Sequence, residues 1–254
     1  MSGFLSGKTS LTTVQTADIA ADAITLAKLA GGTDGELITW DASGNPAAVG
    51  AGTSGHFLKS QGAGSVPVFA ADNKGTWNII GTSVASGSSS LTITGLDSTY
   101  DTYAIAISDI KVATDSVLMQ MTLGDSSGLD TGASDYGWWH SQAVIDADST
   151  SGAANVLSED SADSKISLTG DNNPIGNATS EGFSGMYWLN RPGDGAMMPT
   201  IHGTYHGTSF NVLGIGGLSF GIRKAVITLD RISIFASSGN LTSGRLTIWG
   251  IAHA

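Results

Sequence analysis

Cysteine is absent from the chain, so no disulfide can form and no thiolate is offered for catalysis or metal binding. Basic residues are also scarce: 11 Lys and Arg stand against 22 Asp and Glu, and the formal net charge is −11. Nucleic acid and anionic lipid both attract basic surfaces, so this composition argues against either partner. The sequence lacks the roughly 18 to 20 uninterrupted apolar residues of a membrane-spanning helix, and we expect no membrane insertion.

Glycine, in contrast, is abundant. The 254 residues include 35 Gly and only 5 Pro, and 41% of the chain is hydrophobic. That hydrophobic content is too high for a disordered chain, and the glycine favours tight turns over long helices. The fold is therefore expected to be mainly β. Residues 1–8 lack the basic start and apolar core of a signal peptide, so we expect synthesis in the cytoplasm.

One short pattern occurs twice, over residues 35–46 and 55–67. Each copy has a Gly, a pair of adjacent apolar residues, a short polar run, a Gly-bearing turn and a Pro. This pattern predicts a strand, a turn and a return strand. A two-stranded hairpin is marginally stable alone, so the apolar pairs need a partner, for which further copies of the same chain are the simplest candidate. The residues concerned are Leu37, Ile38, Phe57 and Leu58.

The segment before this repeat is predicted to be an extended arm followed by a short helix. Residues 1–15 are rich in Ser and Thr and show no amphipathic period. Thr16 or Asp18 can cap a helix that ends near residue 30. Its apolar positions recur at helical spacing and form one coiled-coil-like seam, with Ile19, Ala23 and Leu26 as candidate contacts between subunits. A helix of about four turns is marginal in isolation.

The pattern changes to short strands from Trp77 onward, after a linker expected at 70–75. Apolar and polar residues alternate, with Gly, Ser, Asp and Asn between the runs, as in a two-sheet sandwich or jelly roll. We therefore expect an N-terminal segment over 1–75 and a C-terminal β-sandwich over 76–254. The predicted strands are 91–96, 103–110, 117–123, 166–168, 185–189, 201–205, 225–229, 232–235 and 246–249.

The last two of these strands are predicted to form a hairpin across the turn at 237–240. Gly239 and Asn240 tolerate positive φ, which such a turn requires. Residues 246, 248 and 250 should share one face, and 247, 249 and 251 the other. Because both faces are largely apolar, one should pack in the core and the other against a neighbouring subunit. Trp249 is the residue expected at that contact.

Two Ser-, Asp- and Gly-rich stretches, 125–134 and 146–164, are predicted to be long surface loops, which often carry recognition sites. Asp125, Asp130 and Asp135 could offer oxygen ligands to calcium. Their spacing does not match an EF-hand loop, so solvated carboxylates are the preferred interpretation.

Two histidines, His202 and His206, lie on a predicted strand. On a strand they share a face but lie about 13 Å apart, too far to chelate one ion within the chain. Ordinary surface or interface histidines are therefore expected, although a symmetry axis could still gather copies of either around an ion. No metal or cofactor is predicted.

No catalytic motif stands out in the sequence. The Gly-x-Ser-x-Gly elbow of a serine hydrolase is missing, and the glycines at 214–217 lack the Lys-Ser/Thr of a phosphate loop. A hydrolase with a pair of catalytic carboxylates stays possible, because sequence cannot reveal which carboxylates lie close together in space. We expect a protein that is not an enzyme.

The segment Tyr136-Gly137-Trp138-Trp139-His140 carries adjacent tryptophans. Neighbouring side chains of a strand point to opposite faces, so one indole should enter the core and the other should lie outside. An exposed ring beside Asp, Asn and Ser loops suits a saccharide, whose C–H faces stack on aromatic rings. The candidate receptor-binding residues are Tyr136, Trp138, Trp139, His140, Asp130 and Asp135. The alternative is one core Trp and one subunit-contact Trp.

Two parts of the sequence resemble bacteriophage proteins. Residues 16–30, followed by Gly-x-Leu-x-x-Trp-Asp-x-x-Gly-x-Pro at 35–46, are similar to the stalk region of tail fibres and related virion appendage proteins. Residues 230–251, with the ending Trp249-Gly250-Ile251, resemble the closing hairpin of small globular domains in phage structural proteins. The resemblance implies a homotrimer whose N-terminal part is attached to the particle and other virion proteins, while the C-terminal part is displayed.

On this basis we expect a virion protein, assembled in the host cytoplasm, that acts as a tail fibre or adhesin on a host-surface glycan or protein. A capsid decoration or head-fibre protein docked on the shell by its N-terminal arm is the first alternative. A glycan-depolymerising tailspike is the second, although 254 residues leave little room for the long β-helix of such enzymes.

Overall fold

The computed structural model describes residues 19–20, 31–71, 76–145, 154–170, 174–190 and 192–252, and these form strands and turns without a helix. No helix able to span a membrane occurs within these ranges. The helix expected over 16–30 lies outside the described residues except for Ile19 and Ala20, which are not helical. The chain divides into two compact units, Met1–Asn73 and Lys74–Ala254, which are described separately.

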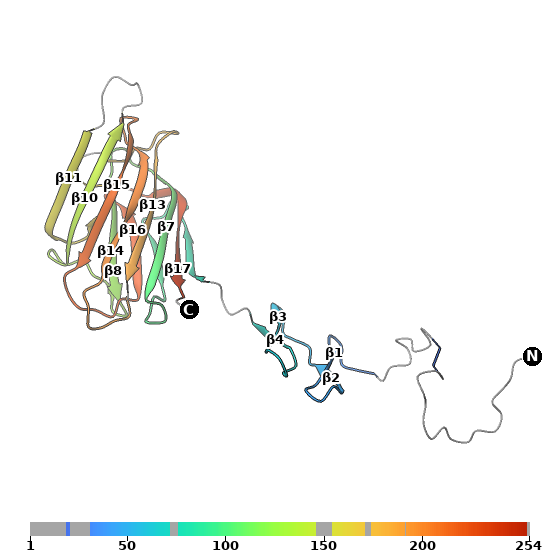
Figure 1. Cartoon of the computed structure of the whole chain (residues 1–254). Helices are drawn as coiled ribbons and strands as arrows, with labels where there is room; N and C mark the ends of the chain where they lie inside the picture. Colours follow the sequence, from blue (N-terminus) through green and yellow to red (C-terminus); the bar gives the residue numbers. More distant parts are fainter. Residues whose placement is uncertain are drawn as a thin grey trace, which may run out of the picture. The chain divides into compact units, whose positions relative to one another are not determined.

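The N-terminal unit contains the two predicted hairpins (Figure 1). Strand β1 (Leu37–Trp40) pairs with β2 (Pro46–Val49), and β3 (His56–Lys59) pairs with β4 (Val68–Ala71). The linker therefore begins later than expected, because Ala70 and Ala71 belong to β4. In the first turn, Asp41 Oδ1 accepts hydrogen bonds from the backbone N–H groups of Ser43 and Asn45, at 2.8 and 2.9 Å.

The C-terminal unit is built from two antiparallel sheets (Figure 1). The larger sheet has eight strands in the order β11 (Ala154–Asp163), β10 (Tyr136–Ile145), β15 (Gly214–Arg223), β14 (Thr200–Thr208), β13 (Gly182–Asn190), β7 (Thr102–Val112), β17 (Leu241–Ile251) and β5 (Trp77–Val84). The smaller sheet has five strands: β12 (Ile166–Ser167), β8 (Met119–Asp125), β16 (Arg231–Ala236) and β6 (Leu91–Thr94) in that order, with β9 (Gly128–Leu129) paired to β8.

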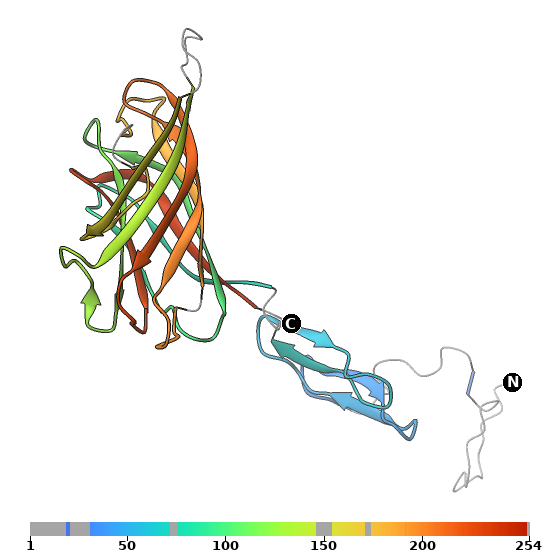
Figure 2. The same ribbon diagram turned by 60° about the vertical axis from the view of Figure 1, so that its left-hand side comes forward.

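The hydrophobic core lies between these sheets, and the larger sheet curls into a half-barrel (Figure 2). Tyr103, Ile105 and Ile107 of β7 enter it from the larger sheet, and residues of β8 and β16 enter it from the smaller one. Gly221 of β15 permits a close approach, since a Cβ there would lie 2.5 Å from Ile166 Cδ1. The alternating pattern predicted the strands themselves well, because most predicted strands coincide with or overlap observed ones.

Two predicted segments are wrong. Residues 146–164 were expected to form a surface loop, but β11 occupies Ala154–Asp163. Its polar side chains suit the exposed edge of a sheet, where hydrophobic alternation is not needed. Residues 225–229 form no strand, because they cross from β15 in the larger sheet to β16 in the smaller one. There the backbone N–H of Leu229 donates to the carbonyl oxygen of Pro192 at 2.9 Å.

The predicted C-terminal hairpin is also wrong. Strand β16 pairs with β6 and β8, whereas β17 pairs with β7 and β5, so residues 237–240 connect one sheet to the other. Gly239 does adopt positive φ, at 74°. The predicted division of faces is confirmed: Leu246 and Ile248 are fully buried in the core, and Trp249 lies on the opposite face.

Replacement of a core leucine should destabilise the C-terminal unit strongly. Leu246→Ala removes a fully buried side chain and is expected to lower the free energy of unfolding by about 3 kcal/mol. Leu218→Ala is the matched control, because Leu218 is 52% exposed on β15 and should change stability by less than about 0.5 kcal/mol. Urea denaturation followed by tryptophan fluorescence measures both. Equal losses would contradict the assigned faces.

Candidate functional site on the outer face of the larger sheet

The outer face of the larger sheet carries a continuous row of cross-strand neighbours, which we call the aromatic row. It crosses all the strands of the sheet, since each member faces the next across a ladder. In order from β11 to β5 its members are Glu159, Trp139, Phe220, His202, Trp188, Ala104, Trp249 and Ile79. Such a row places large rings on one surface without help from loops.

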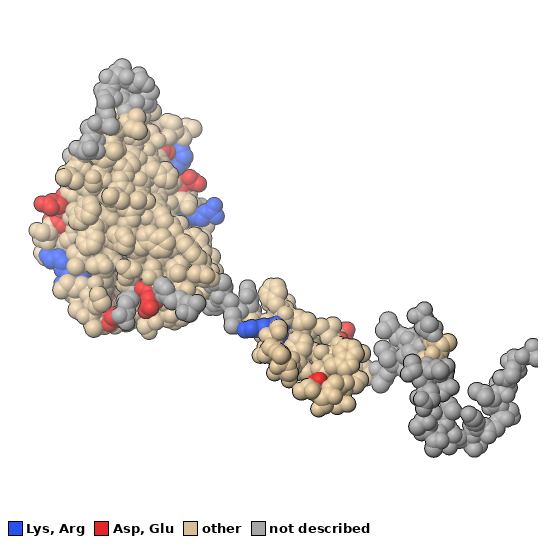
Figure 3. All heavy atoms as spheres, in the orientation of Figure 1, with Lys and Arg blue, Asp and Glu red and all other residues tan. Residues whose placement is uncertain are grey.

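Charge is nearly absent from the centre of this face. The neighbouring row consists of Leu157, Ser141, Leu218, Thr204, Met186, Ala106, Thr247 and Thr82. Among the members of these two rows, Glu159 alone is charged. Figure 3 shows the same face with Lys, Arg, Asp and Glu confined to its margins. An extended uncharged surface with exposed rings is typical of a binding or assembly surface.

Trp139 is the most exposed of the tryptophan and phenylalanine side chains in the aromatic row. Its side chain is 43% exposed, and its ring lies 6.2 Å from that of Phe220 with an interplanar angle of 19°. Two hollows adjoin it. One, of about 430 Å³, is lined by Gly137, Trp138, Trp139, Glu159, Asp160, Ser161 and Phe220. The other, of about 370 Å³, is lined by Trp139, His140, Leu157, Ser158 and Glu159.

Three tryptophans form a second cluster at the β5 end of the row. The ring of Trp77 meets those of Trp188 and Trp249 edge-on, with centroids 5.8 and 5.9 Å away. Trp249 is half-buried and already packs within its own chain. It lies on the expected face, and its contact with another subunit stays a prediction.

The structure separates the candidate receptor residues of segment 136–140. Trp139 lies outside, whereas Tyr136 and His140 are fully buried and Trp138 is 4% exposed. These three therefore support the surface rather than offer their side chains to a partner, which corrects the prediction for them. The His140 ring stacks on that of Tyr205 at 6.1 Å. The expectation that one indole enters the core and the other faces outward is confirmed.

Trp138 bonds to the end of β11, next to a register shift of the β10–β11 pair between Tyr136 and Trp138. Its Nε1–H donates to Asp163 Oδ2 at 3.1 Å, and Lys165 forms an ion pair with Asp163 Oδ1 at 2.9 Å. Burial raises the pKa of Asp163, but the bonds from Lys165 and Trp138 outweigh it and hold the pKa below its usual range. Stability from this carboxylate is thus present at neutral pH and is lost as the pH falls through the lowered pKa. Beyond this shift, the β10–β11 ladder places Glu159 opposite Trp139.

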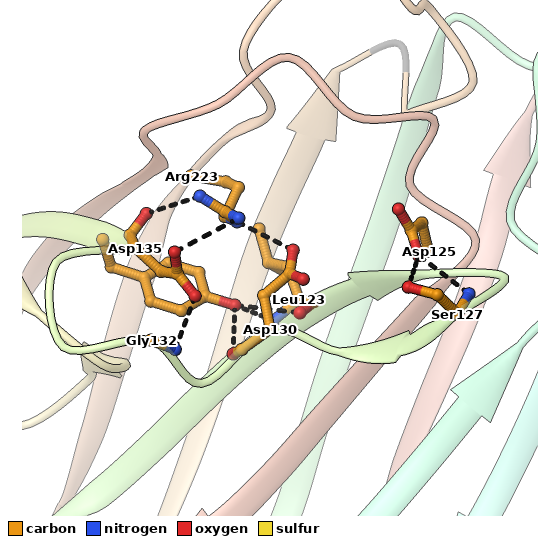
Figure 4. Close-up of polar contacts among 8 residues, drawn as sticks. Leu123, Asp125, Ser127, Asp130, Gly132, Asp135 and Arg223 are labelled. Carbon is orange, nitrogen blue, oxygen red and sulfur yellow. Dashed lines mark hydrogen bonds and ion pairs between the residues drawn. The ribbon is translucent and has the colours of Figure 1, made fainter.

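Asp130 and Asp135 are held by Arg223 (Figure 4). Arg223 Nε donates to Asp130 Oδ2 at 2.8 Å, and its guanidinium approaches Asp135 Oδ1 at 3.3 Å. Asp135 Oδ2 also accepts a hydrogen bond from the Gly132 N–H at 2.6 Å. These carboxylates are mostly buried by their partners, so the expectation of solvated loop carboxylates is wrong for both.

Tyr136 links the same loop to β8, since its hydroxyl lies 3.0 Å from the carbonyl oxygen of Asp130 as well as next to Leu123. Its hydroxyl accepts from the N–H of Leu123 at 2.8 Å and donates to the carbonyl oxygen of Leu123 at 2.8 Å. The guanidinium of Arg223 lies 5.7 Å from the centre of the Tyr136 ring, within cation–π range. Burial raises the pKa of the Tyr136 hydroxyl, so the phenol stays neutral. The arrangement is structural rather than a site with an open ligand position.

Metal binding finds little support in the described ranges. No group of three His, Asp or Glu side chains there could hold an ion. Asp125 instead accepts hydrogen bonds from Ser127, at 2.6 Å from Oγ and 2.8 Å from the backbone N–H. His202 and His206 both lie on the exposed face of β14, as the strand interpretation predicted.

The apolar pairs of the N-terminal hairpins are exposed in the single chain. Leu37 is 43% exposed, Ile38 66%, Phe57 63% and Leu58 50%. Ile19 is 43% exposed, while Ala23 and Leu26 lie outside the described residues. The hairpins therefore leave these four apolar side chains largely exposed, as expected for units that need a partner.

Sequence reasoning did not identify Phe220, Glu159, Trp188 or Trp77 as parts of this face. Phe220 belongs to the alternating run Leu218-Ser219-Phe220, which could have placed it on a strand face. Glu159 lies in the polar segment mistaken for a loop. The ladder order that brings both beside Trp139 is not encoded in any local pattern.

Removal of the arginine that holds the 130–135 loop should weaken the fold. Arg223→Met leaves two partly buried carboxylates without their cation and is expected to lower the free energy of unfolding by about 3 kcal/mol. Arg231→Met is the matched control, because its ion pair with Asp230 joins adjacent residues at a more exposed position. Urea denaturation at neutral pH should separate the two variants. A similar small effect for both would contradict a structural role for Arg223.

Comparisons with known proteins leave the family of the chain open. No family model matches it, and searches of curated proteins and of solved structures gave no match.

Proposed function

We propose that the chain is a structural protein of a bacteriophage virion, a tail fibre or adhesin that attaches the particle to the host surface. In this proposal residues 1–75 form an arm, a short helix and a hairpin stalk that assemble three copies and join them to other virion proteins. The C-terminal unit, a jelly-roll-like sandwich in this scheme, carries the contact with a host-surface glycan or protein.

The proposed attachment function rests on one observation, the largely uncharged outer face of the larger sheet with its exposed Trp139. Exposed aromatic and aliphatic area on such a face is costly to leave in water unless it meets a ligand or a partner. Its rings offer flat apolar area, while Thr204 and Ser141 offer hydrogen bonds. Both kinds of contact are what recognition of a cell surface requires.

The proposed assembly of three copies rests on the exposure of apolar residues on both N-terminal hairpins. Ile38 at 66% and Phe57 at 63% are poor solvent-facing residues. A two-stranded hairpin gains stability when a third surface covers such side chains. Three copies of the same repeated hairpin would cover one another with matching side chains, as closed symmetric assemblies do.

A head-fibre or capsid decoration protein is the second candidate, since the same exposed hairpin residues could rest on a shell. The two candidates predict different places in the particle. Gold-labelled antibodies against the C-terminal unit should decorate the tail under the first proposal. Decoration of the head would contradict the tail-fibre proposal and favour a head-fibre or capsid decoration protein.

Charges placed on the hairpins should disrupt assembly. Ile38→Asp with Leu58→Asp is expected to shift the full-length protein from trimer toward monomer, because a carboxylate does not tolerate burial between chains. Ser43→Asp adds a charge at a turn and serves as the control, which should leave the mass unchanged. Light scattering coupled to size exclusion measures the masses. An intact trimer in the double variant would move assembly to another part of the chain.

Purified protein should compete with virus for the host. If the C-terminal unit carries attachment, excess full-length protein is expected to occupy the receptor and slow adsorption of particles that bear the same protein. Free particles are counted over time after mixing with host cells. Bovine serum albumin at equal mass controls for non-specific effects, and unchanged adsorption would count against the adhesin proposal.

A further inference from the structure

We infer that the two hollows beside Trp139 bind an uncharged glycan, with one sugar unit on each side of the indole. This inference rests on the proposed attachment function and gives the chemical class of the surface ligand. The residues that carry it are Trp139, Phe220 and Glu159, on three adjacent strands of the larger sheet.

The geometry provides stacking surfaces for a sugar. The C–H faces of a pyranose pack against aromatic rings, and Trp139 with Phe220 offers two nearly parallel rings, 19° apart. Trp139 lines both hollows, so it separates two adjacent compartments. Their volumes of about 430 and 370 Å³ fall within the range of about 300–1,000 Å³ of small-ligand pockets.

Polar residues that line the two hollows can accept hydrogen bonds from the hydroxyl groups of a sugar. Glu159 faces Trp139 across the β10–β11 ladder and lines both hollows, so its carboxylate can accept hydrogen bonds from a sugar on either side. Asp160 and Ser161 line the larger hollow. Rings on one wall and oxygen atoms on the other match the two chemical characters of a saccharide.

The charge of the residues around the hollows favours neutral glycans over acidic ones. The charged side chains that line the hollows are the carboxylates Glu159 and Asp160, and the whole chain carries a formal net charge of −11. The neighbouring Lys224 directs its ammonium to the carbonyl oxygen of Ser161 at 2.6 Å. A uronate or sialate would therefore meet like charge beside Glu159, whereas a neutral sugar would not.

The hollows also favour a chain-like ligand over a second copy of the protein. A flat contact between subunits would cover Trp139 but leave the spaces on its two sides empty. A glycan that passes over the indole places one unit in each space. The row continues from Phe220 to His202 and Trp188, so a longer glycan can extend across the strands.

A glycan array tests this inference with the full-length protein. It displays neutral hexose and N-acetylhexosamine oligosaccharides beside uronate-containing and sialylated ones. Binding is expected on neutral members only, and Trp139→Ala should weaken it at least about tenfold. Trp77→Ala is the matched control: it removes an indole of similar exposure, 46%, from the other end of the same face, and should leave affinity for two-unit oligosaccharides within about twofold.

A second variant tests the role of charge. Glu159→Gln keeps a hydrogen-bonding group and removes the carboxylate, so it should gain binding to the uronate-containing oligosaccharides. Equal affinity of wild type and Trp139→Ala, or wild-type preference for acidic glycans, would overturn the inference. Unchanged thermal midpoints in all the variants confirm that folding is intact.

Binding to intact host cells separates this inference from the attachment function. If wild type and Trp139→Ala bind cells equally, attachment stands and the Trp139 site is refuted. If wild type binds cells but no neutral glycan of the array, the ligand class is refuted. If wild type binds neither, the attachment function itself fails and the site loses its basis.

Discussion

Burial of apolar side chains between the two sheets is the interaction on which the rest of the C-terminal unit depends. Because strand residues alternate between faces, committing Trp138 and Tyr205 to the core commits Trp139 and Thr204 to the surface. The outer face is thus a direct consequence of the inner one. A slip of one residue in β10 would place Trp139 inside and Trp138 outside. The bond from Trp138 to Asp163 opposes such a slip and, through the ladder, keeps Glu159 opposite Trp139.

Arg223 plays a comparable role at the end of β15. Its guanidinium pairs with both Asp130 and Asp135 and lies over the ring of Tyr136, so one side chain joins the 130–135 loop to the larger sheet. The acidic composition makes this arrangement necessary, because each carboxylate that turns inward needs a cation or a set of N–H donors. In a chain with so few basic residues, the loss of one such cation cannot be compensated by its neighbours.

Local pattern predicted most of the strands and little of their pairing. The alternation in β7, β13 and β14 is clear because each buries one face, and the repeat at 35–67 predicts two hairpins because its turns carry Gly and Asp. Strand β11 escaped prediction because an exposed edge strand tolerates Glu159 and Asp160. The hairpin expected from 232 to 249 failed for another reason: β16 and β17 each find better partners far away in the sequence. For the same reason the Trp139, Phe220 and Glu159 group was only partly foreseen.

The place where the chain enters the C-terminal unit has a mechanical consequence. Trp77 begins the edge strand β5, and Trp139 lies near the opposite edge of the same sheet. A pulling force applied between these two residues must cross every ladder from β5 to β10, with the tension perpendicular to the strands. Hydrogen-bonded ladders in series share one load, so the weakest of them sets the rupture force. The core contacts with the smaller sheet provide a parallel route for the same load, and sheet-to-sheet packing therefore protects the ladders from tearing.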